Sequence, residues 1–124
     1  WTPEADVAAA DVKADDFDVV IIPGGYSPDH MRRTPAMIQL VADAARLGKV
    51  VGAICHGPWM LCSARCIQGR NVTGFFAIKD DVENAGGVWQ DGACVRDGNI
   101  VTSRTPEDLP VFMQGILATL AQQA

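Results

Sequence analysis

Two short apolar runs constrain the fold of this chain most strongly. VVIIP at 19–23 and KVVGAIC at 49–55 are rich in β-branched residues and show no polar alternation. That pattern is typical of strands buried on both faces of a sheet. Between them, the apolar spacing of 34–47 predicts a helix with Pro35 in its first turn and Gly48 after its end. The strand, helix and strand predict a parallel crossover unit in an α/β fold.

The remainder of the chain continues this α/β pattern with shorter elements. A helix is predicted over 56–66, entered through Gly57 and Pro58, and a final helix over 105–120. Between these helices we expect the following weaker elements: a strand over 72–76, a brief helix over 80–87, and short strands over 88–89, 93–96 and 99–103. The Asp91-Gly92 and Asp97-Gly98 pairs are turn formers, so this last region is predicted to form hairpins.

Length and composition indicate one ordinary globular domain. The chain has 124 residues, of which 48% are apolar and 20% are charged, which fits a single domain over 1–124 with one hydrophobic core. Residues 1–16 are acidic and alanine-rich, and they are predicted to be a poorly defined lead-in to that domain.

Charge and hydropathy exclude two classes of partner. The net charge is -5 and the basic residues are scattered, with Arg32-Arg33 as the only adjacent pair, so no nucleic-acid partner is expected. No apolar stretch approaches the roughly 20 residues needed to cross a bilayer, and no secretory signal is recognisable. We therefore expect no membrane partner and a cytoplasmic location.

The cysteines do not form a metal or disulfide pattern. Cys55, Cys62, Cys66 and Cys94 lack CxxC spacing, and the chain holds only two histidines. Neither a metal site nor a disulfide framework is predicted, and no cofactor is implied. Free thiols in a reducing compartment are the expected state.

Cys55 stands out because it ends a buried strand and precedes a helix. Ala53 two residues before it and Gly57 two residues after it match the small-x-nucleophile-x-Gly spacing of a nucleophile elbow, where a tight turn leaves no room for larger side chains. The start of the following helix favours the thiolate form. The backbone N–H of His56, with a second donor from the Gly24-Gly25 loop, is placed to bind an oxyanion.

Alternative interpretations apply to the neighbouring groups. Most cysteines in apolar runs are simply buried, and that interpretation is retained for Cys62, Cys66 and Cys94. The spacing alone allows the His56 side chain to lie beside the Cys55 sulfur or to point away from it. The other histidine, His30, precedes the cysteine, so a glutaminase-type histidine downstream of His56 is excluded.

Four segments, in order, carry a family resemblance. They are IIPGGYSPDHMRR, GKVVGAICHGPWML, IKDDVENAGGVWQD and DGNIVTSRTPEDLP. From about residue 12 to the C-terminus the chain resembles PfpI-like members of the ThiJ/PfpI superfamily. The resemblance implies a flavodoxin-like α/β three-layer sandwich with a mostly parallel sheet and a nucleophile elbow.

The resemblance also implies roles for individual residues. Cys55 would be the nucleophile and His56 its partner, with the Gly25 and His56 N–H groups forming the oxyanion hole and Gly24 and Tyr26 contacting substrate. Asp29 matches the position of an acidic residue that a neighbouring subunit contributes to the site, although aspartate is one methylene shorter than the usual glutamate. A surface acid preceding a helix is the alternative interpretation of Asp29. A homo-oligomer, dimer or hexamer, is therefore implied.

One departure from the family lies at the front of the chain. Family members begin with a strand, a helix and another strand, and the first strand carries a glutamate near the nucleophile. This sequence has no counterpart of these elements, so an N-terminally truncated version of the fold is expected. Three interpretations stay open: the segment is cut off, another chain supplies it, or the domain exists without it and covers its exposed sheet edges by oligomerisation.

The function implied is that of a cysteine-dependent hydrolase or a glyoxalase- or deglycase-like enzyme. Its substrate would be a small carbonyl compound or a peptide, because a thiolate adds to either kind of carbonyl. Two alternatives stay open: a redox- or stress-sensing protein with an oxidisable Cys55, and a catalytically silent oligomeric module.

Overall fold

A four-stranded sheet forms the centre of the computed structural model, which describes residues 4–123. The strand order is β1 (Val19–Ile22), β2 (Val50–Ile54), β6 (Ile100–Ser103) and β5 (Val95–Asp97). The first three strands are parallel, with Val51 paired to both Val20 and Ile100, and β5 is antiparallel to β6. The predicted parallel crossover between 19–23 and 49–55 is confirmed.

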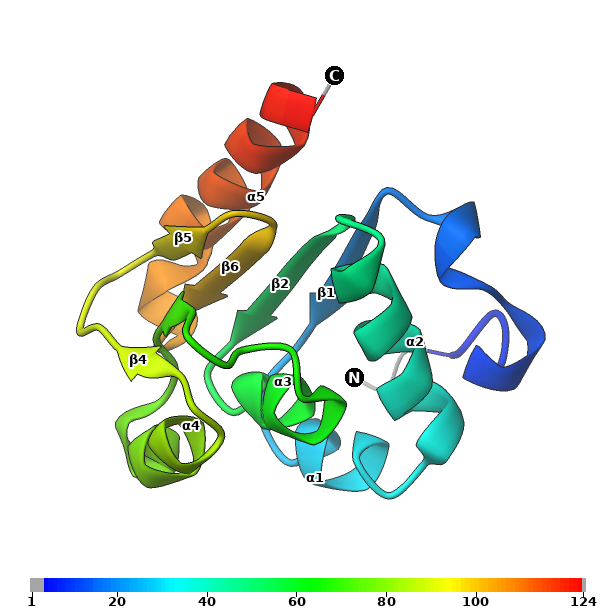
Figure 1. Cartoon of the computed structure of the whole chain (residues 1–124), viewed down its shortest axis with the longest axis horizontal. Coiled ribbons are helices and arrows are strands. Elements are labelled where there is room, and N and C mark those ends of the chain that lie inside the picture. Colours follow the sequence, from blue (N-terminus) through cyan, green and yellow to red (C-terminus); the bar gives the residue numbers. More distant parts are fainter. Residues whose placement is uncertain (1–3, 124) are drawn as a thin grey trace.

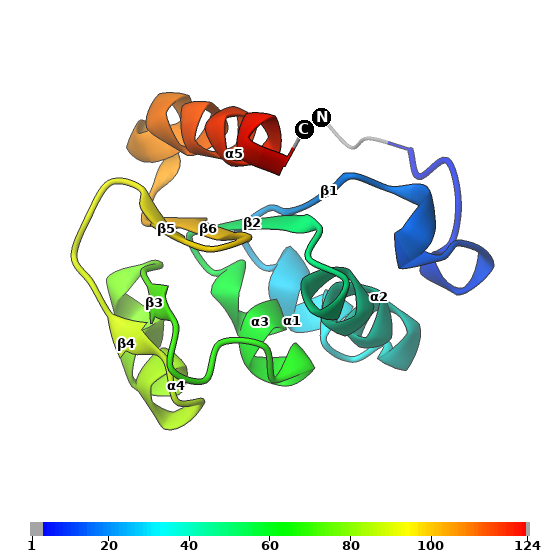
Figure 2. The ribbon, with the colours of Figure 1, turned by 45° about the horizontal axis from the view of Figure 1, so that its top comes forward.

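Helices cover both faces of this sheet and produce three layers (Figure 1, Figure 2). On one face lie α1 (Ser27–Met31), α2 (Pro35–Arg46) and α3 (Pro58–Ala64), and on the other lies α5 (Leu109–Gln123). Every residue of β2 is buried, which explains why its sequence lacks polar alternation. The α/β sandwich predicted from the sequence is the observed architecture.

Two apolar clusters fill the spaces between the layers. Toward α2 and α3, side chains such as Ile22, Val51 and Leu61 pack together, and toward α5 Phe112 and Ile116 pack on the opposite face of the sheet. A Cβ added at Gly52 would lie 2.7 Å from the Ile116 side chain, so this glycine lets α5 approach the sheet closely. Burial of each large side chain contributes about 1.5–3 kcal/mol to folding.

A second, two-stranded sheet stands beside the main one. Its strands β3 (Asn71–Val72) and β4 (Val88–Trp89) are parallel and are joined through a 3-10 turn (Phe76–Ile78) and α4 (Lys79–Asn84). The strand expected over 72–76 is observed only over 71–72, as β3. After Val72 the backbone N–H of Thr73 donates to the side chain of Thr102, and a continuous ladder is not formed.

The hairpin prediction is half right. Asp97-Gly98 does join β5 to β6 as an antiparallel pair. The predicted pairing of 88–89 with 93–96 is wrong, because β4 pairs with β3. The N–H of Val88 donates to the Arg70 carbonyl, and the N–H of Gln90 donates to the Val72 carbonyl. That partner is distant in sequence, and local turn signals do not reveal it.

Helix ends also differ from the sequence-based expectation. The short helix α1 is too brief for its apolar spacing to predict, and the last helix begins at Leu109 after a 3-10 turn, Pro106–Asp108. Thr34 occupies the N-cap position of α2 as expected, but its side chain makes no capping hydrogen bond.

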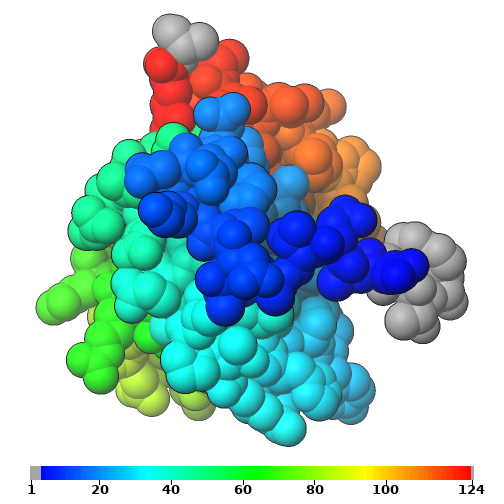
Figure 3. Space-filling view, turned by 90° about the vertical axis from the view of Figure 1, so that its right-hand side faces the viewer, coloured from blue at the N-terminus to red at the C-terminus, as the bar shows by residue number. Residues whose placement is uncertain are grey.

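The first described segment lies against the α2 side of the molecule. Two 3-10 turns, Ala9–Asp11 and Ala14–Asp16, contact α2, and Ala14 is buried in the core. Figure 3 shows this dark blue segment lying across the cyan surface of the residues that follow it. Within residues 4–123, no helix combines the length and apolarity that a bilayer crossing requires.

Candidate active site

The backbone at Cys55 makes a sharp, strained turn at the end of β2. Its φ is +62°, a left-handed conformation that a residue with a Cβ adopts at a cost of about 1–2 kcal/mol. The Cys55 N–H donates to Ser103 (3.1 Å), and its carbonyl accepts from the N–H of Phe75 (2.8 Å). These hydrogen bonds to neighbouring segments hold the strained residue in place.

Two glycines are required by close backbone contacts around this turn. A Cβ on Gly57 would lie 2.7 Å from the Ile22 carbonyl oxygen, and a Cβ on Gly24 would lie 2.7 Å from the Cβ of Cys55. The steric reason given for the Ala53-x-Cys55-x-Gly57 spacing therefore holds in the structure. The turn after β2 and the loop after β1 pack directly on each other.

The His56 side chain lies beside the sulfur. The Cys55 Sγ and the His56 Nδ1 are 3.3 Å apart, and both residues are half-buried. The imidazole contacts the rings of Trp59 (centroids 5.0 Å apart, planes at 64°) and Phe75 (4.9 Å, 59°). The question left open by the spacing is answered, since the ring faces the thiol.

Neither Trp59 nor Phe75 was predicted from the sequence as a neighbour of the thiol. Trp59 follows His56 by three residues at the start of a helix, a spacing that places two side chains on one face and that could have identified it. Phe75 lies 19 residues after His56 in the sequence and offers no such local signal.

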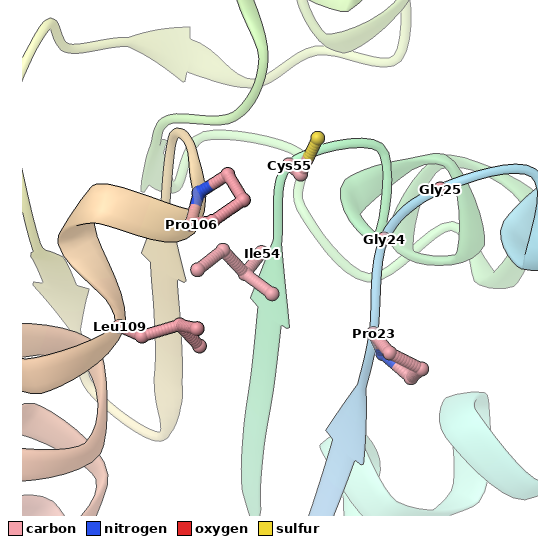
Figure 4. A pocket seen from close by; sticks show the side chains of 7 residues that line it. All are labelled: Pro23, Gly24, Gly25, Ile54, Cys55, Pro106 and Leu109. Carbon is pink, nitrogen blue, oxygen red and sulfur yellow. The ribbon is translucent and has the colours of Figure 1, made fainter. Parts of the chain in front are cut away.

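An apolar cavity of about 310 Å³ adjoins the cysteine. Figure 4 shows its lining, which comprises Pro23, Gly24, Gly25, Ile54, Cys55, Pro106 and Leu109. The sulfur sits at the rim and is directed away from the side chains of Ile54 and Leu109. The cavity lies where β1, β2 and β6 end, the edge at which parallel sheets commonly bind ligands.

Of the other predicted site residues, Gly24 and Gly25 line this cavity, whereas His56 and Tyr26 do not. Tyr26 is 86% exposed. Gly25 has a φ of +70°. Within residues 4–123, the backbone N–H groups of Gly25 and His56 donate no hydrogen bond to another residue of the chain.

Asp29 lies on α1 and is engaged with a different partner. Its carboxylate accepts a hydrogen bond from the guanidinium of Arg33 at 2.5 Å. Among the described residues, no hydrogen bond joins Asp29 to His56 of the same chain.

The other three cysteines are in different environments. Burial raises the pKa of the Cys62 and Cys66 thiols to about 11 each, and it also raises the pKa of Cys94. These thiols are therefore protonated near neutral pH. In the described part of the chain, no three side chains of His, Cys, Asp or Glu gather as a metal-ligating group.

Comparison with known proteins places the chain in a family. The DJ-1/PfpI family model matches residues 2–119. The chain is similar to protein/nucleic acid deglycase 2 of Escherichia coli (42% identical over 116 residues, covering 93% of this chain and 67% of that protein). It is also similar to general stress protein 18 of Bacillus subtilis (42% over 116 residues, covering 93% and 67%). The chain thus spans about two thirds of the length of these relatives.

A solved structure gives the same result. A two-domain protein from Anabaena variabilis, which contains DJ-1/ThiJ/PfpI-like and ferritin-like domains, superposes with a TM-score of 0.89 at 45% identity. The match covers 91% of this chain and 32% of that one. The resemblance noted in the sequence and its flavodoxin-like α/β fold are confirmed. This chain belongs to the DJ-1/PfpI family.

Proposed function

We propose that this chain carries the active site of a cysteine-dependent enzyme that acts on small carbonyl compounds, in the manner of a glyoxalase or deglycase. The observation that carries the proposal is the strained Cys55, whose sulfur lies 3.3 Å from His56 at the rim of an apolar cavity. A relative of 42% identity is named a deglycase, which supports the same chemistry.

The reaction can be written for methylglyoxal. The Cys55 thiolate adds to the aldehyde carbon, and the resulting oxyanion is bound by the N–H groups of Gly25 and His56 and then protonated, which gives a hemithioacetal. His56 removes the proton from that carbon and an enediol forms. Reprotonation at the neighbouring carbon yields a thioester. Water then hydrolyses the thioester to lactate and releases the thiolate, so the net reaction adds one water to methylglyoxal.

Cavity size favours a small substrate over a peptide. At about 310 Å³ the cavity is at the lower end of the range for ligand sites, roughly 300–1,000 Å³. Its lining has few polar groups to hold an extended backbone. Peptide hydrolysis by the same thiolate is the second candidate function.

We further propose that the site is completed in a homo-oligomer, dimer or hexamer, in which Asp29 of a neighbouring subunit approaches His56. Asp29 is partly exposed on α1, with its side chain 43% accessible, so it is available to a second copy of the chain. Its Arg33 pair is exposed and therefore weak, and a stronger partner could replace it.

The test compares the purified chain with Cys55→Ser, using Cys94→Ser as a matched thiol control. We expect the wild type and Cys94→Ser to convert methylglyoxal to lactate, and Cys55→Ser to lose at least about a hundredfold in rate, because the oxygen nucleophile lacks the thiolate's reactivity. Casein cleavage with no lactate formation would support the peptidase instead. A Cys55 that oxidises while neither substrate turns over would contradict the proposal in favour of a redox sensor.

A further inference from the structure

We propose that Trp59 is a positioning residue, which holds the His56 imidazole against the Cys55 sulfur and is itself fixed by Asp81. The inference rests on the proposed Cys55–His56 pair but adds a group outside it. Trp59 comes from the first turn of α3 and Asp81 from α4, so the arrangement links the elbow to the small β3–β4 unit.

The need for such a group follows from the contacts of His56. Among the described residues, the imidazole has one hydrogen-bond partner, the Cys55 sulfur at 3.3 Å. In Cys-His and Ser-His sites, a third group normally hydrogen-bonds the imidazole and sets its orientation. Within residues 4–123 no carboxylate does so here. The imidazole instead packs against two aromatic rings, Trp59 and Phe75.

Trp59 is well suited to this task because its own ring is held at two places. Its indole N–H donates to the Asp81 carboxylate (2.8 Å), and the Arg32 guanidinium lies 5.4 Å from the ring centroid. Arg32 in turn donates to the hydroxyl of Ser63 (3.0 Å). A ring held by both a hydrogen bond and a cation–π contact is restricted in its rotamers, and it passes that restriction to the imidazole.

Phe75, the second ring in contact with the imidazole, is held in place in a different way. Its backbone N–H donates to the Cys55 carbonyl, which fixes the position of its Cα relative to the elbow. Phe75 is therefore part of the turn itself. The restraint on the Trp59 ring can instead be removed by substituting Asp81. This residue is exposed, so its substitution leaves the turn and the core unchanged.

The experiment uses two readouts for Asp81→Ala, Asp81→Asn and Trp59→Leu, with Asp80→Ala as a matched control on the same helix. The first readout is the pH dependence of iodoacetamide alkylation at Cys55, with the adduct located by peptide mass. The second is the kcat and KM for methylglyoxal. Thermal melting verifies that each variant is folded.

Asp81→Ala and Trp59→Leu are expected to shift the alkylation midpoint of Cys55 to higher pH, because a loosened imidazole stabilises the thiolate less. Both should lower kcat by about ten- to a hundredfold with a smaller change in KM, the scale expected for a misplaced catalytic group. Asp81→Asn keeps an acceptor for the indole N–H and should recover most of the loss. Asp80→Ala should match the wild type.

A folded Trp59→Leu protein with unchanged alkylation and kcat would overturn the inference, and so would equal losses in Asp80→Ala and Asp81→Ala. If Trp59→Leu fails to fold, the Asp81→Ala and Asp81→Asn pair decides the question. If no variant, including the wild type, turns over methylglyoxal while the alkylation shift is observed, the positioning inference stands and the proposed function fails.

Discussion

At the scale of single residues, the backbone of Cys55 is the most unusual feature of the chain. A cysteine at a φ of +62° gains nothing locally from that conformation, and glycine would occupy it more easily. The Cys55 side chain lies beside His56 on the rim of a cavity, although its backbone conformation is unfavourable for a residue with a Cβ. Strained residues of this kind cluster at functional sites, which agrees with the role proposed for this sulfur.

The strain at Cys55 predicts a stability difference between two variants. Cys55→Gly should be more stable than Cys55→Ala by about 0.5–1 kcal/mol, because relief of the left-handed conformation exceeds the entropy cost of glycine. The measurement is the free energy of unfolding in urea. Ala118→Gly, at an exposed position in the interior of α5, is the control and should destabilise by about 0.5–1 kcal/mol. If Cys55→Gly proves the less stable of the two, the turn is not strained.

At the scale of elements, the start of α5 is fixed by one buried carboxylate. Asp108 accepts hydrogen bonds from the backbone N–H (3.1 Å) and the Nε (2.9 Å) of Arg104, which directly follows β6. The Asp108 side chain is only 8% exposed. Pro106 and Leu109, on either side of Asp108, line the cavity. The Asp108–Arg104 pair therefore determines the position of one wall of the site.

The Asp108 pair predicts a dependence of stability on pH. The Arg104 hydrogen bonds lower the pKa of Asp108, so its carboxylate stabilises the fold above its ordinary pKa of 3.8, and this contribution is lost as the pH falls through the folded-state value. Asp108→Asn should have a lower Tm than the wild type at pH 7. This difference in Tm should become smaller below about pH 4. Asp91→Asn, at an exposed partner of Arg104, should have a smaller effect. A Tm difference between the wild type and Asp108→Asn that stays constant from pH 7 to pH 2 would contradict this account.

At the scale of the whole molecule, the site exists because three parallel strands end at one edge. Gly24 follows β1, Cys55 follows β2 and Pro106 follows β6, and all three line the same cavity. The sheet brings together segments that are about 30 to 50 residues apart in the sequence. The two layers of helices bury the strands behind them and leave this edge open.

Two half-buried thiols, Cys62 and Cys66, predict a loss of stability at alkaline pH. Burial raises the pKa of Cys62 and Cys66 from 9.0 to about 11, so their stabilising contribution is complete below about pH 9 and is lost as the pH rises through about 11. The free energy of unfolding should therefore fall across this range. In a Cys62→Ala, Cys66→Ala double variant, the free energy of unfolding should fall less steeply with pH. An equally steep fall would show that other groups cause the loss of stability.

The amino-acid sequence by itself determined the features that depend on local pattern. Uninterrupted β-branched runs predicted β1 and β2, helical spacing predicted α2, α3 and α5, and the small-x-Cys-x-Gly spacing predicted the elbow at Cys55. These succeed because residues within a few positions of one another supply the steric and hydrophobic reasons.

Tertiary structure alone decided the features that depend on distant partners. It paired β4 with β3, brought Phe75 against His56 and joined Asp81 to Trp59. The physical reason is that a side chain's environment is set by which elements pack together, and packing is a property of the folded chain as a whole.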